Sequence, residues 1–439
     1  MKTKPIFGYL FWMIPVLLFL YSCDNDKGEI DNDMDDVDKI SENSPPRDFS
    51  LLTVNDGATE VDVTPTFSWE ESVDPDGNMV SYDFYLGTSE DEMILFAENL
   101  TEPLFEVNNR LSLYQNYYWM VTAKDSEGAA THSSTNMFIT RGLNFLVDSV
   151  TDEAEFSGRN NFGSAIFRDK IWVVGGRDGS ENGRGNDVWM SEDGKSWIEV
   201  DSNAPFVERS GHITISFKDK LWVIGGGTND SRLNDIWYSN DGNEWVEIMS
   251  ETKFSGRNLV KAVVFKDKLW VIGGIGQNNA PESDIWNTSD GITWTEITNQ
   301  VPFPARFSHN LVVFDDKLWV LGGLTGLTGN VEVLGDVWSS EDGINWIEVK
   351  NKAEFGPRRD HTSVVFDEKM WVIGGNDGTD YLNDVWYSVD GITWTEAIED
   401  APFTGKAGHA SHIFNNKIWV VGGFNRVSPV RKNDVWAFD

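Results

Sequence analysis

One unit of about fifty residues is repeated six times between Leu143 and Asp439 of this 439-residue chain. Each unit begins with a basic residue, has a tryptophan thirteen positions later, and continues with Gly-Gly and then Asp-Val-Trp or Asp-Ile-Trp. The basic residues are Arg159, Arg209, Arg257, Arg306, Arg358 and Lys406. Because this register never slips, the sequence predicts six copies of one supersecondary unit that pack against each other.

The fifth unit shows which elements the repeat predicts. Residues 361–366, 370–375 and 383–388 are rich in β-branched and aromatic residues, as strands are. Asp390-Gly391 is a hairpin signal that leads into a fourth strand at 393–396. We expect the tryptophan rings to fill the wedge between neighbouring units, and the Gly-Gly pair to let the backbone crowd near an axis.

The Gly-Gly pair, the Asp-Val/Ile-Trp segment and the spaced tryptophans closely resemble kelch repeats, and seventeen of the twenty tryptophans lie in this frame. The resemblance covers residues 143–439 and implies an all-β, six-bladed propeller of four-stranded blades. The sixth unit ends at Asp439 without its outer strand. Since Val147 precedes Arg159 by the same twelve residues that separate the third tryptophan from the next unit, we expect 147–150 to supply that strand.

All length variation lies in one loop of the unit. The interval from the second glycine to the aspartate of Asp-Val/Ile-Trp ranges from 9 to 13 residues, whereas the other intervals are constant. In an up-and-down blade this loop shares a face with the loop that enters each blade. Of the twelve arginines in the propeller, eleven are assigned to this face, namely 159, 177, 184, 209, 232, 257, 306, 358, 359, 426 and 431. The loop face is therefore the predicted binding surface.

Residues that break the six-fold symmetry are the candidates for ligand binding. They are Lys261 and Asn310 on inner strands, His412 where the other units are apolar, and Arg177, Arg359, Tyr381 and Arg426 on the loops. The six-fold basic residues themselves are interpreted as structural, as a ring of ion pairs between blades with the aspartates 187, 235, 284, 336, 384 and 434. The alternative, a functional Arg ring, stays open.

Four histidines recur three residues after the basic residue: His212, His309, His361 and His409. A metal site is disfavoured because equivalent strands diverge around a propeller axis and no carboxylate joins the histidines at ligand spacing. No metal and no cofactor is expected.

The N-terminus predicts export and lipid anchoring. Two lysines precede an apolar run from Ile6 to Leu20 that is too short for a comfortable membrane span, and residues 1–22 are interpreted as a signal peptide. Leu20-Tyr21-Ser22-Cys23 resembles the lipobox of bacterial lipoproteins, which implies lipidation of Cys23, the single cysteine. The acidic residues that follow resemble the export signals of Bacteroidetes lipoproteins, so the expected location is the outer membrane, on the cell surface.

Two segments separate this anchor from the repeats. Residues 23–46 are acidic and poor in large apolar residues, so we expect a solvated tether. Residues 47–141 alternate strand-like stretches with turn signals and resemble a fibronectin type III domain, a small β-sandwich whose core includes Trp69 and the 117–119 aromatic run. Asp74-Pro75-Asp76-Gly77 is interpreted as a turn rather than a calcium site. The module is interpreted as a spacer.

The formal charge of −36 argues against nucleic acid and against basic patches on anionic lipid, so the lipid on Cys23 is the one expected membrane contact. A surface binding or adhesion protein for a glycan or protein ligand is favoured. A sugar-modifying enzyme similar to sialic acid epimerases and a protein scaffold stay as alternatives, but no acid–base pair carries over by motif. Galactose oxidase is excluded, since its copper site needs a tyrosine crosslinked to a cysteine.

Overall fold

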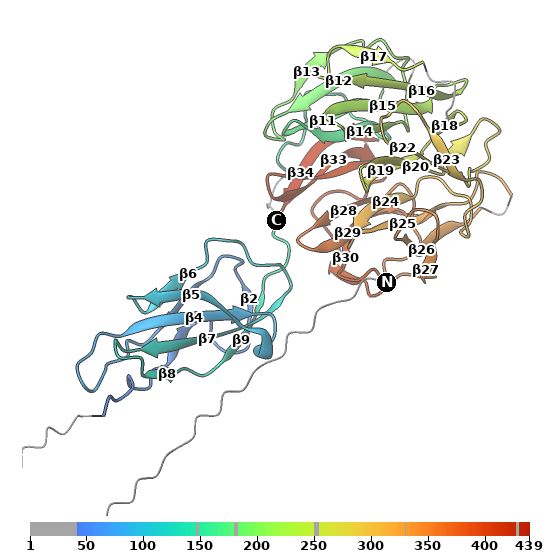
Figure 1. Ribbon diagram of the computed structural model, residues 1–439. Coiled ribbons are helices and arrows are strands. Elements are labelled where there is room, and N and C mark those ends of the chain that lie inside the picture. Colours follow the sequence, from blue (N-terminus) through green and yellow to red (C-terminus); the bar gives the residue numbers. More distant parts are fainter. Residues whose placement is uncertain (1–41, 146–148, 180–182, 250–253, 330, 427–429) are drawn as a thin grey trace, which may run out of the picture.

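A computed structural model describes residues 42–439, except 146–148, 180–182, 250–253, 330 and 427–429. Figure 1 shows a small β-domain joined to a larger ring of sheets. The one helical element in the described part is a single 3-10 turn, η1 (Glu90–Glu92). The all-β prediction is confirmed. None of the helical structure among these residues has the length and apolar character needed to cross a membrane.

The first domain is a sandwich of two sheets, with strand orders β1-β3-β6 and β2-β9-β7-β4-β5, and with β8 added to β7. Its strands are β1 (Leu51–Thr53), β2 (Ala58–Val61), β3 (Thr66–Trp69), β4 (Ser81–Gly87), β5 (Ile94–Leu100), β6 (Leu104–Glu106), β7 (Asn116–Lys124), β8 (Ala130–His132) and β9 (Asn136–Thr140). Trp69, Tyr117 and Trp119 are buried between the sheets, as predicted, whereas Tyr118 points the other way and is half-buried. The resemblance to fibronectin type III itself stays a prediction.

The chain joins this sandwich before the predicted boundary at Arg47. The Asn43 amide donates to Asp125 Oδ2 (2.8 Å), and the Ser44 N–H donates to Asp76 Oδ2 (2.6 Å). Asp74 Oδ1 accepts from the N–H groups of Asp76 and Asn78, which is the geometry of a turn. The last residues of the expected tether are therefore held against the Asp-Pro-Asp-Gly turn.

Six antiparallel sheets follow, one for each repeat. Blade one contains β10 (Gly163–Phe167), β11 (Lys170–Gly176), β12 (Gly185–Ser191) and β13 (Ile198–Asp201). Blade two contains β14 (Ile213–Phe217), β15 (Lys220–Gly227), β16 (Arg232–Ser239) and β17 (Trp245–Glu247). Blade three contains β19 (Lys261–Phe265), β20 (Lys268–Ile272), β22 (Ile285–Thr288) and β23 (Thr295–Thr298), with the short pair β18 (Arg257–Asn258) and β21 (Ile275–Gly276) beside it.

Blade four contains β24 (Asn310–Phe314), β25 (Lys317–Leu324), β26 (Val333–Ser340) and β27 (Ile347–Lys350). Blade five contains β28 (Thr362–Phe366), β29 (Lys369–Asn376), β30 (Tyr381–Ser388) and β31 (Thr395–Ile398). Blade six contains β32 (Ala410–Phe414), β33 (Lys417–Phe424) and β34 (Arg431–Phe438). The first strands of the blades contact each other in the closed order β10, β14, β19, β24, β28, β32 and back to β10, so they surround the axis. The predicted six-bladed propeller is confirmed.

Tryptophan rings form the contacts between blades. The Trp172 ring of blade one lies against Gly242 in the Asp-Gly turn of blade two, where an added Cβ would lie 2.0 Å from the ring. Trp419 of blade six meets Gly194 of blade one in the same way, which closes the ring. Each of these glycines also has a positive φ, so both sterics and backbone conformation require glycine at the turn. The predicted wedge role of the tryptophans is confirmed.

The six-fold basic residues are structural, but they do not pair between blades as expected. Arg159 donates from Nη1 to Asp187 Oδ1 (2.9 Å) and from Nη2 to Asp187 Oδ2 (2.7 Å), and both residues belong to blade one. Its Nη1 also donates to the carbonyl of Gly175, the first residue of the Gly-Gly pair (2.9 Å). The other five units repeat the ion pair of this clamp, with Lys406 and Asp434 in blade six. Each pair fastens the entry loop of a blade to its own third strand.

The sandwich packs on the face of the propeller that carries the short turns. The Leu113 N–H donates to Asp367 Oδ2 in the β28–β29 turn (2.6 Å), and Arg141 donates from Nη1 to the Asp439 carbonyl (3.0 Å). The rings of Tyr114 and Tyr387 stack at 4.9 Å, and Val63 and Leu113 belong to one core cluster with apolar side chains of blades five and six. The predicted spacer thus shares a hydrophobic core with the propeller.

Candidate functional site

Three hollows lie next to one another in the propeller. A cavity of about 420 Å³ lies between the inner strands, a space of about 50 Å³ lies at the loop end of these strands, and a pocket of about 220 Å³ lies on the loop face. The small space shares Lys261 and His409 with the cavity and shares Asn161 and Asp360 with the pocket. The small space therefore adjoins both the cavity between the inner strands and the pocket on the loop face.

A ring of six backbone hydrogen bonds surrounds the narrow level. The N–H of Asn161 donates to the carbonyl of Gly408 (2.8 Å), and the N–H of Gly211 donates to the carbonyl of Asn161 (2.6 Å). The bonds continue through Leu259, Ser308 and Asp360 and return to Gly408. All six residues have a positive φ, which costs free energy at the non-glycine positions and is held in place by the ring. Nothing in the residue types predicted this ring, because backbone groups make it.

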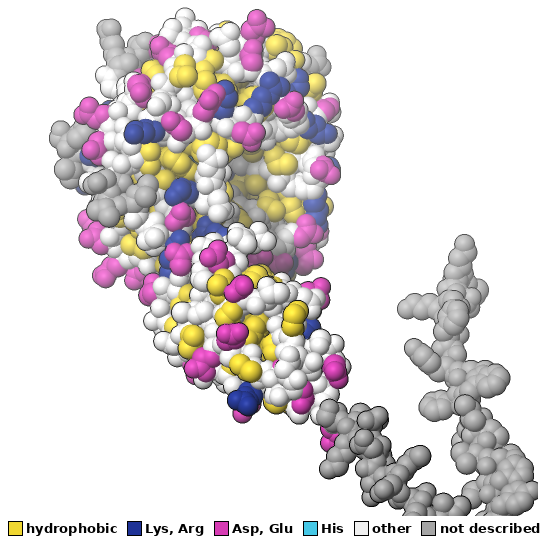
Figure 2. Space-filling model, turned by 90° about the vertical axis from the view of Figure 1, so that its left-hand side faces the viewer, with side chains coloured by type: hydrophobic (Ala, Val, Ile, Leu, Met, Phe, Trp, Pro, Cys, Tyr) yellow, Lys and Arg dark blue, Asp and Glu magenta, His cyan; other side chains and the backbone are white. Residues whose placement is uncertain are grey.

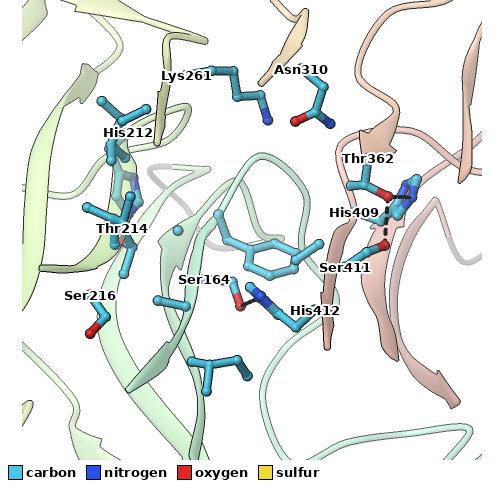
Figure 3. A pocket seen from close by; sticks show the side chains of 18 of the residues that line it. Ser164, His212, Thr214, Ser216, Lys261, Asn310, Thr362, His409, Ser411 and His412 are labelled. Atoms are coloured by element: carbon cyan, nitrogen blue, oxygen red, sulfur yellow. Dashed lines mark hydrogen bonds between the residues drawn. The ribbon is translucent and has the colours of Figure 1, made fainter. Parts of the chain in front are cut away.

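The cavity is lined mainly by polar side chains of the inner strands (Figure 3). Three of the predicted ligand-binding residues lie here, namely Lys261, Asn310 and His412. Asn310 donates from Nδ2 to the His361 carbonyl (2.9 Å), and His412 Nε2 is 2.7 Å from the Ser164 hydroxyl. These contacts fix the two side chains in the channel wall.

Lys261 is the one charged side chain among the residues that line the cavity. Its ammonium extends into the cavity in Figure 3, and within the described part of the chain it has neither a hydrogen bond nor an ion pair. Burial lowers the pKa of Lys261, and the negative charge of Asp360, which belongs to the backbone ring, opposes that shift. A cation in this position attracts an anion into the channel.

The recurring histidines lie at the loop end of the inner strands and are buried. Burial, together with the charge of Arg209, lowers the pKa of His212 to about 3, and burial with the charge of Lys406 does the same for His409. His309 and His361 have pKa values well below 6.5 for the same two kinds of reason. The histidines are therefore neutral at pH 7. No group of three or more His, Cys, Asp or Glu residues in the described ranges is arranged to hold a metal ion.

The loop-face pocket brings together predicted residues from different blades. Arg177 of blade one lines it with Arg359 and Tyr381 of blade five. Tyr381 forms an edge-to-face pair with Phe424 of blade six (5.5 Å). Arg431, which sequence reasoning placed on this face but did not single out, completes the wall. Blade one lies beside blade six only because the ring closes.

The arginines of this pocket are only partly neutralised. Arg359 Nη1 lies 2.9 Å from Asp360 Oδ2, and Arg431 donates from Nε to the side-chain oxygen of Asn160 (3.3 Å). Arg177 is exposed. The lining residues thus include three arginines and one aspartate, although the whole chain has a formal charge of −36. The pocket is a local positive site on an acidic protein.

A second pair of arginines extends this basic surface toward blades two and three. Arg184 donates from Nε to the Ser210 hydroxyl (3.1 Å). Burial first, and then the charges of Arg177 and Arg232, lower the pKa of Arg184. These three guanidinium groups therefore lie within electrostatic reach of each other.

The remaining predicted residues do not line any of the three hollows. Arg426 is exposed on the loop between β33 and β34, next to residues outside the described part of the chain. Cys23 and the signal segment 1–22 lie outside the described residues. Five of the eleven loop-face arginines, namely 159, 209, 257, 306 and 358, are buried in the clamps and face no ligand. The basic surface is therefore made by six arginines, not eleven.

Comparisons with known proteins agree with this architecture. The KLHDC2/KLHL20/DRC7 Kelch-repeats domain model matches residues 111–323. The Attractin/LZTR1 beta-propeller model matches residues 269–439. A solved structure described as "Structure of YjhT" is similar with a TM-score of 0.51 and 17% identity, over 66% of this chain and 96% of that chain. No curated protein matches the chain.

Proposed function

We propose that this chain, whose larger domain is a kelch-repeat β-propeller, is a lipid-anchored surface protein that binds an acidic ligand on its loop face. The observation that carries the proposal is the pocket formed by Arg177, Arg359, Arg431 and Tyr381. Guanidinium groups bind carboxylate and sulfate in a bidentate way, and an aromatic ring beside them offers a stacking surface. A rigid propeller that presents variable loops is suited to recognition.

The ligand we propose is an acidic glycan. The Tyr381 and Phe424 rings lie edge to face, so they give the pocket an apolar wall next to its cationic one. A saccharide ring that bears a carboxylate or sulfate uses both walls, because the ring packs on an aromatic side chain while the acid meets the arginines. The ligand must approach a strongly acidic protein, so binding depends on the local positive field and weakens with salt.

Anchoring follows from the N-terminal sequence. The lipobox-like tripeptide before Cys23 supports a lipidated N-terminus, and the acidic segment that follows supports display away from the membrane. A lipid-anchored protein with a rigid binding face is suited to capture glycans at the cell surface. The propeller is the part that makes the contact in this proposal.

The test is a glycan array probed with the mature chain carrying Cys23→Ser, which removes the lipid without touching the folded domains. We expect binding to acidic glycans, and its loss in Arg177→Gln with Arg359→Gln. The matched control is Lys195→Gln with Lys268→Gln, which removes two exposed positive charges from the opposite face.

Three outcomes contradict the proposal. If the control pair loses binding, the site lies on the face opposite the loops. If both pairs bind equally well, Arg177 and Arg359 do not belong to the site. Turnover of any glycan on the array replaces the binding role with the enzyme alternative. Equal melting temperatures of the two variant pairs exclude unfolding as the cause of any loss.

A further inference from the structure

The channel cavity is a second polar chamber, and the loop-face proposal does not use it. Its lining residues belong to all six blades, and they include hydroxyl groups from blades one, two, five and six. The blades of a propeller surround a central channel, and the wall of this one carries a lysine and several hydroxyl groups. Here a volume of about 420 Å³ remains, within the range of pockets that hold small molecules.

One blade breaks the symmetry of this wall. Lys261 is the first residue of β19, and the equivalent positions of the other blades hold Gly163, Ile213, Asn310, Thr362 and Ala410. A ring of six identical residues would indicate a structural role, as it does for the clamps. A single cation on one side of the channel instead suits a ligand that has one anionic end.

Polar atoms around the cavity are left without partners. Thr214 Oγ1 and the Ser363 hydroxyl are buried and have no hydrogen-bond partner among the described residues. The described part of the chain therefore does not use their bonding capacity. Other groups are already oriented, because the Thr362 hydroxyl bonds to both Ser411 (2.6 Å) and His409 Nε2 (2.8 Å).

We infer that the channel binds a small polyhydroxylated carboxylate of monosaccharide size, whose carboxylate meets Lys261 and whose hydroxyl groups meet Thr214 and Ser363. The single charge fixes the orientation of the ligand. The hydroxyl groups of the wall distinguish it from an apolar acid of the same size.

Access is from the face that carries the sandwich. The backbone ring narrows the axis at the loop end, where the space is about 50 Å³. Figure 2 shows the propeller hollowed near its centre just above the sandwich. The channel site and the loop-face pocket therefore lie on opposite sides of this backbone ring.

The test is isothermal titration calorimetry of the mature Cys23→Ser chain with D-glucuronate and D-gluconate as probes. The controls are D-glucose, which lacks the charge, and acetate, which lacks the hydroxyl groups. We expect one of the two acids to bind and both controls to bind at least about tenfold more weakly. Lys261→Met should lower the affinity for the acid at least about tenfold, and Thr214→Val should lower it less. Lys261→Arg should restore part of the affinity that Lys261→Met loses.

A matched variant separates this site from the loop face. Arg177→Gln should leave the affinity for the acid unchanged, and Lys261→Met should leave glycan capture on the loop face unchanged. Lys261→Met should also raise the melting temperature of the free protein, because it removes an unpaired ammonium from the channel wall. A lysine with a structural role would lower that temperature when it is replaced.

The inference is overturned if neither acid binds at about 10 mM, well above the dissociation constants of specific sites. It is also overturned if Lys261→Met binds the acid as the wild type does, or if glucose binds equally well. Loss of acid binding in Arg177→Gln alone would place the acid in the loop-face pocket and reject the channel site, while leaving the proposed function intact.

Discussion

Thr151 and Val435 form an antiparallel bridge in the register that Asp201 and Val188 have in blade one. The Val150 N–H donates to the Val435 carbonyl (2.8 Å), and Phe145 packs on Phe438 with 4.4 Å between ring centroids. The segment that precedes blade one therefore occupies the outer position of blade six. Residues 147 and 148 of the predicted strand lie outside the described residues, and the described pairing consists of isolated bridges at Phe145 and Thr151 beside a three-stranded sheet, so the fourth strand at 147–150 stays a prediction.

Loss of this closing segment should open the ring. We expect replacement of 144–150 by a Gly-Ser segment of equal length to lower the free energy of unfolding by roughly 3–5 kcal/mol, because it exposes the edge of β34 and its apolar neighbours. Urea denaturation measures the change. Phe145→Ala alone should cost about 1–3 kcal/mol, whereas Asn144→Ala, at an exposed side chain, should cost less than about 0.5 kcal/mol. Equal stability of the linker variant and the wild type would refute closure.

The clamp of blade four offers a test of the structural role of the basic residues. Arg306 is fully buried and donates to both oxygens of Asp336 at 2.7 Å. Arg306→Met should destabilise the protein by about 3–5 kcal/mol, because it leaves the aspartate buried without its cation. Arg168 makes an exposed ion pair with Asp219 on the opposite face, so Arg168→Met should cost less than about 1 kcal/mol. A small effect of both replacements in chemical denaturation would show that the clamps are dispensable.

Stability should fall as the pH is lowered below about 6.5. Burial, then neighbouring charge, lowers the pKa of His212 and of His409 to about 3, whereas the unfolded chain protonates its histidines near pH 6.5. The unfolded state therefore binds more protons between these values. The stability that the neutral histidines contribute is complete above pH 6.5 and decreases by about 1.4 kcal/mol per pH unit for each histidine below it.

Urea denaturation at pH 7.5, 6.0 and 5.0 measures this slope. The control is His361→Phe, since blade one already holds Phe162 at the equivalent position. The burial of His361 and the charge of Arg358 hold its pKa well below 6.5, so the variant should show a shallower dependence on pH. An unchanged slope in the variant would show that His361 does not titrate on unfolding.

Cys23→Ala should release the protein from the membrane fraction. The cysteine follows a lipobox-like tripeptide and has no second cysteine with which to form an internal disulfide. Fractionation of cells and the mass of the N-terminal peptide measure the anchor. Continued membrane association of the variant, with no lipid mass on the wild-type peptide, would reject it.

The architecture was predictable from the sequence because each blade is a local unit. The spacing from Arg358 to Trp371 and onward to Asp384 lies within one sheet, so a constant interval in the chain is a constant geometry in space. The bridge of Thr151 to blade six follows the same spacing, since Thr151 is eight residues before Arg159 just as Asp201 is eight residues before Arg209. Backbone pairing in one sheet follows sequence spacing.

The candidate binding sites could not be predicted from residue spacing in the sequence, because they depend on contacts between different blades. Arg177 and Arg359 are 182 residues apart and meet because blade six lies between blades five and one in the closed ring. The same closure joins backbone groups of all six blades into one hydrogen-bonded ring, whatever their side chains. Sequence therefore determined the blades, their order and the six basic residues that pair with aspartates, because these follow from periodic local pairing. Tertiary structure alone decided that each of these pairs lies within one blade and which of the remaining arginines line a common pocket, because that depends on where each side chain lies in the closed ring.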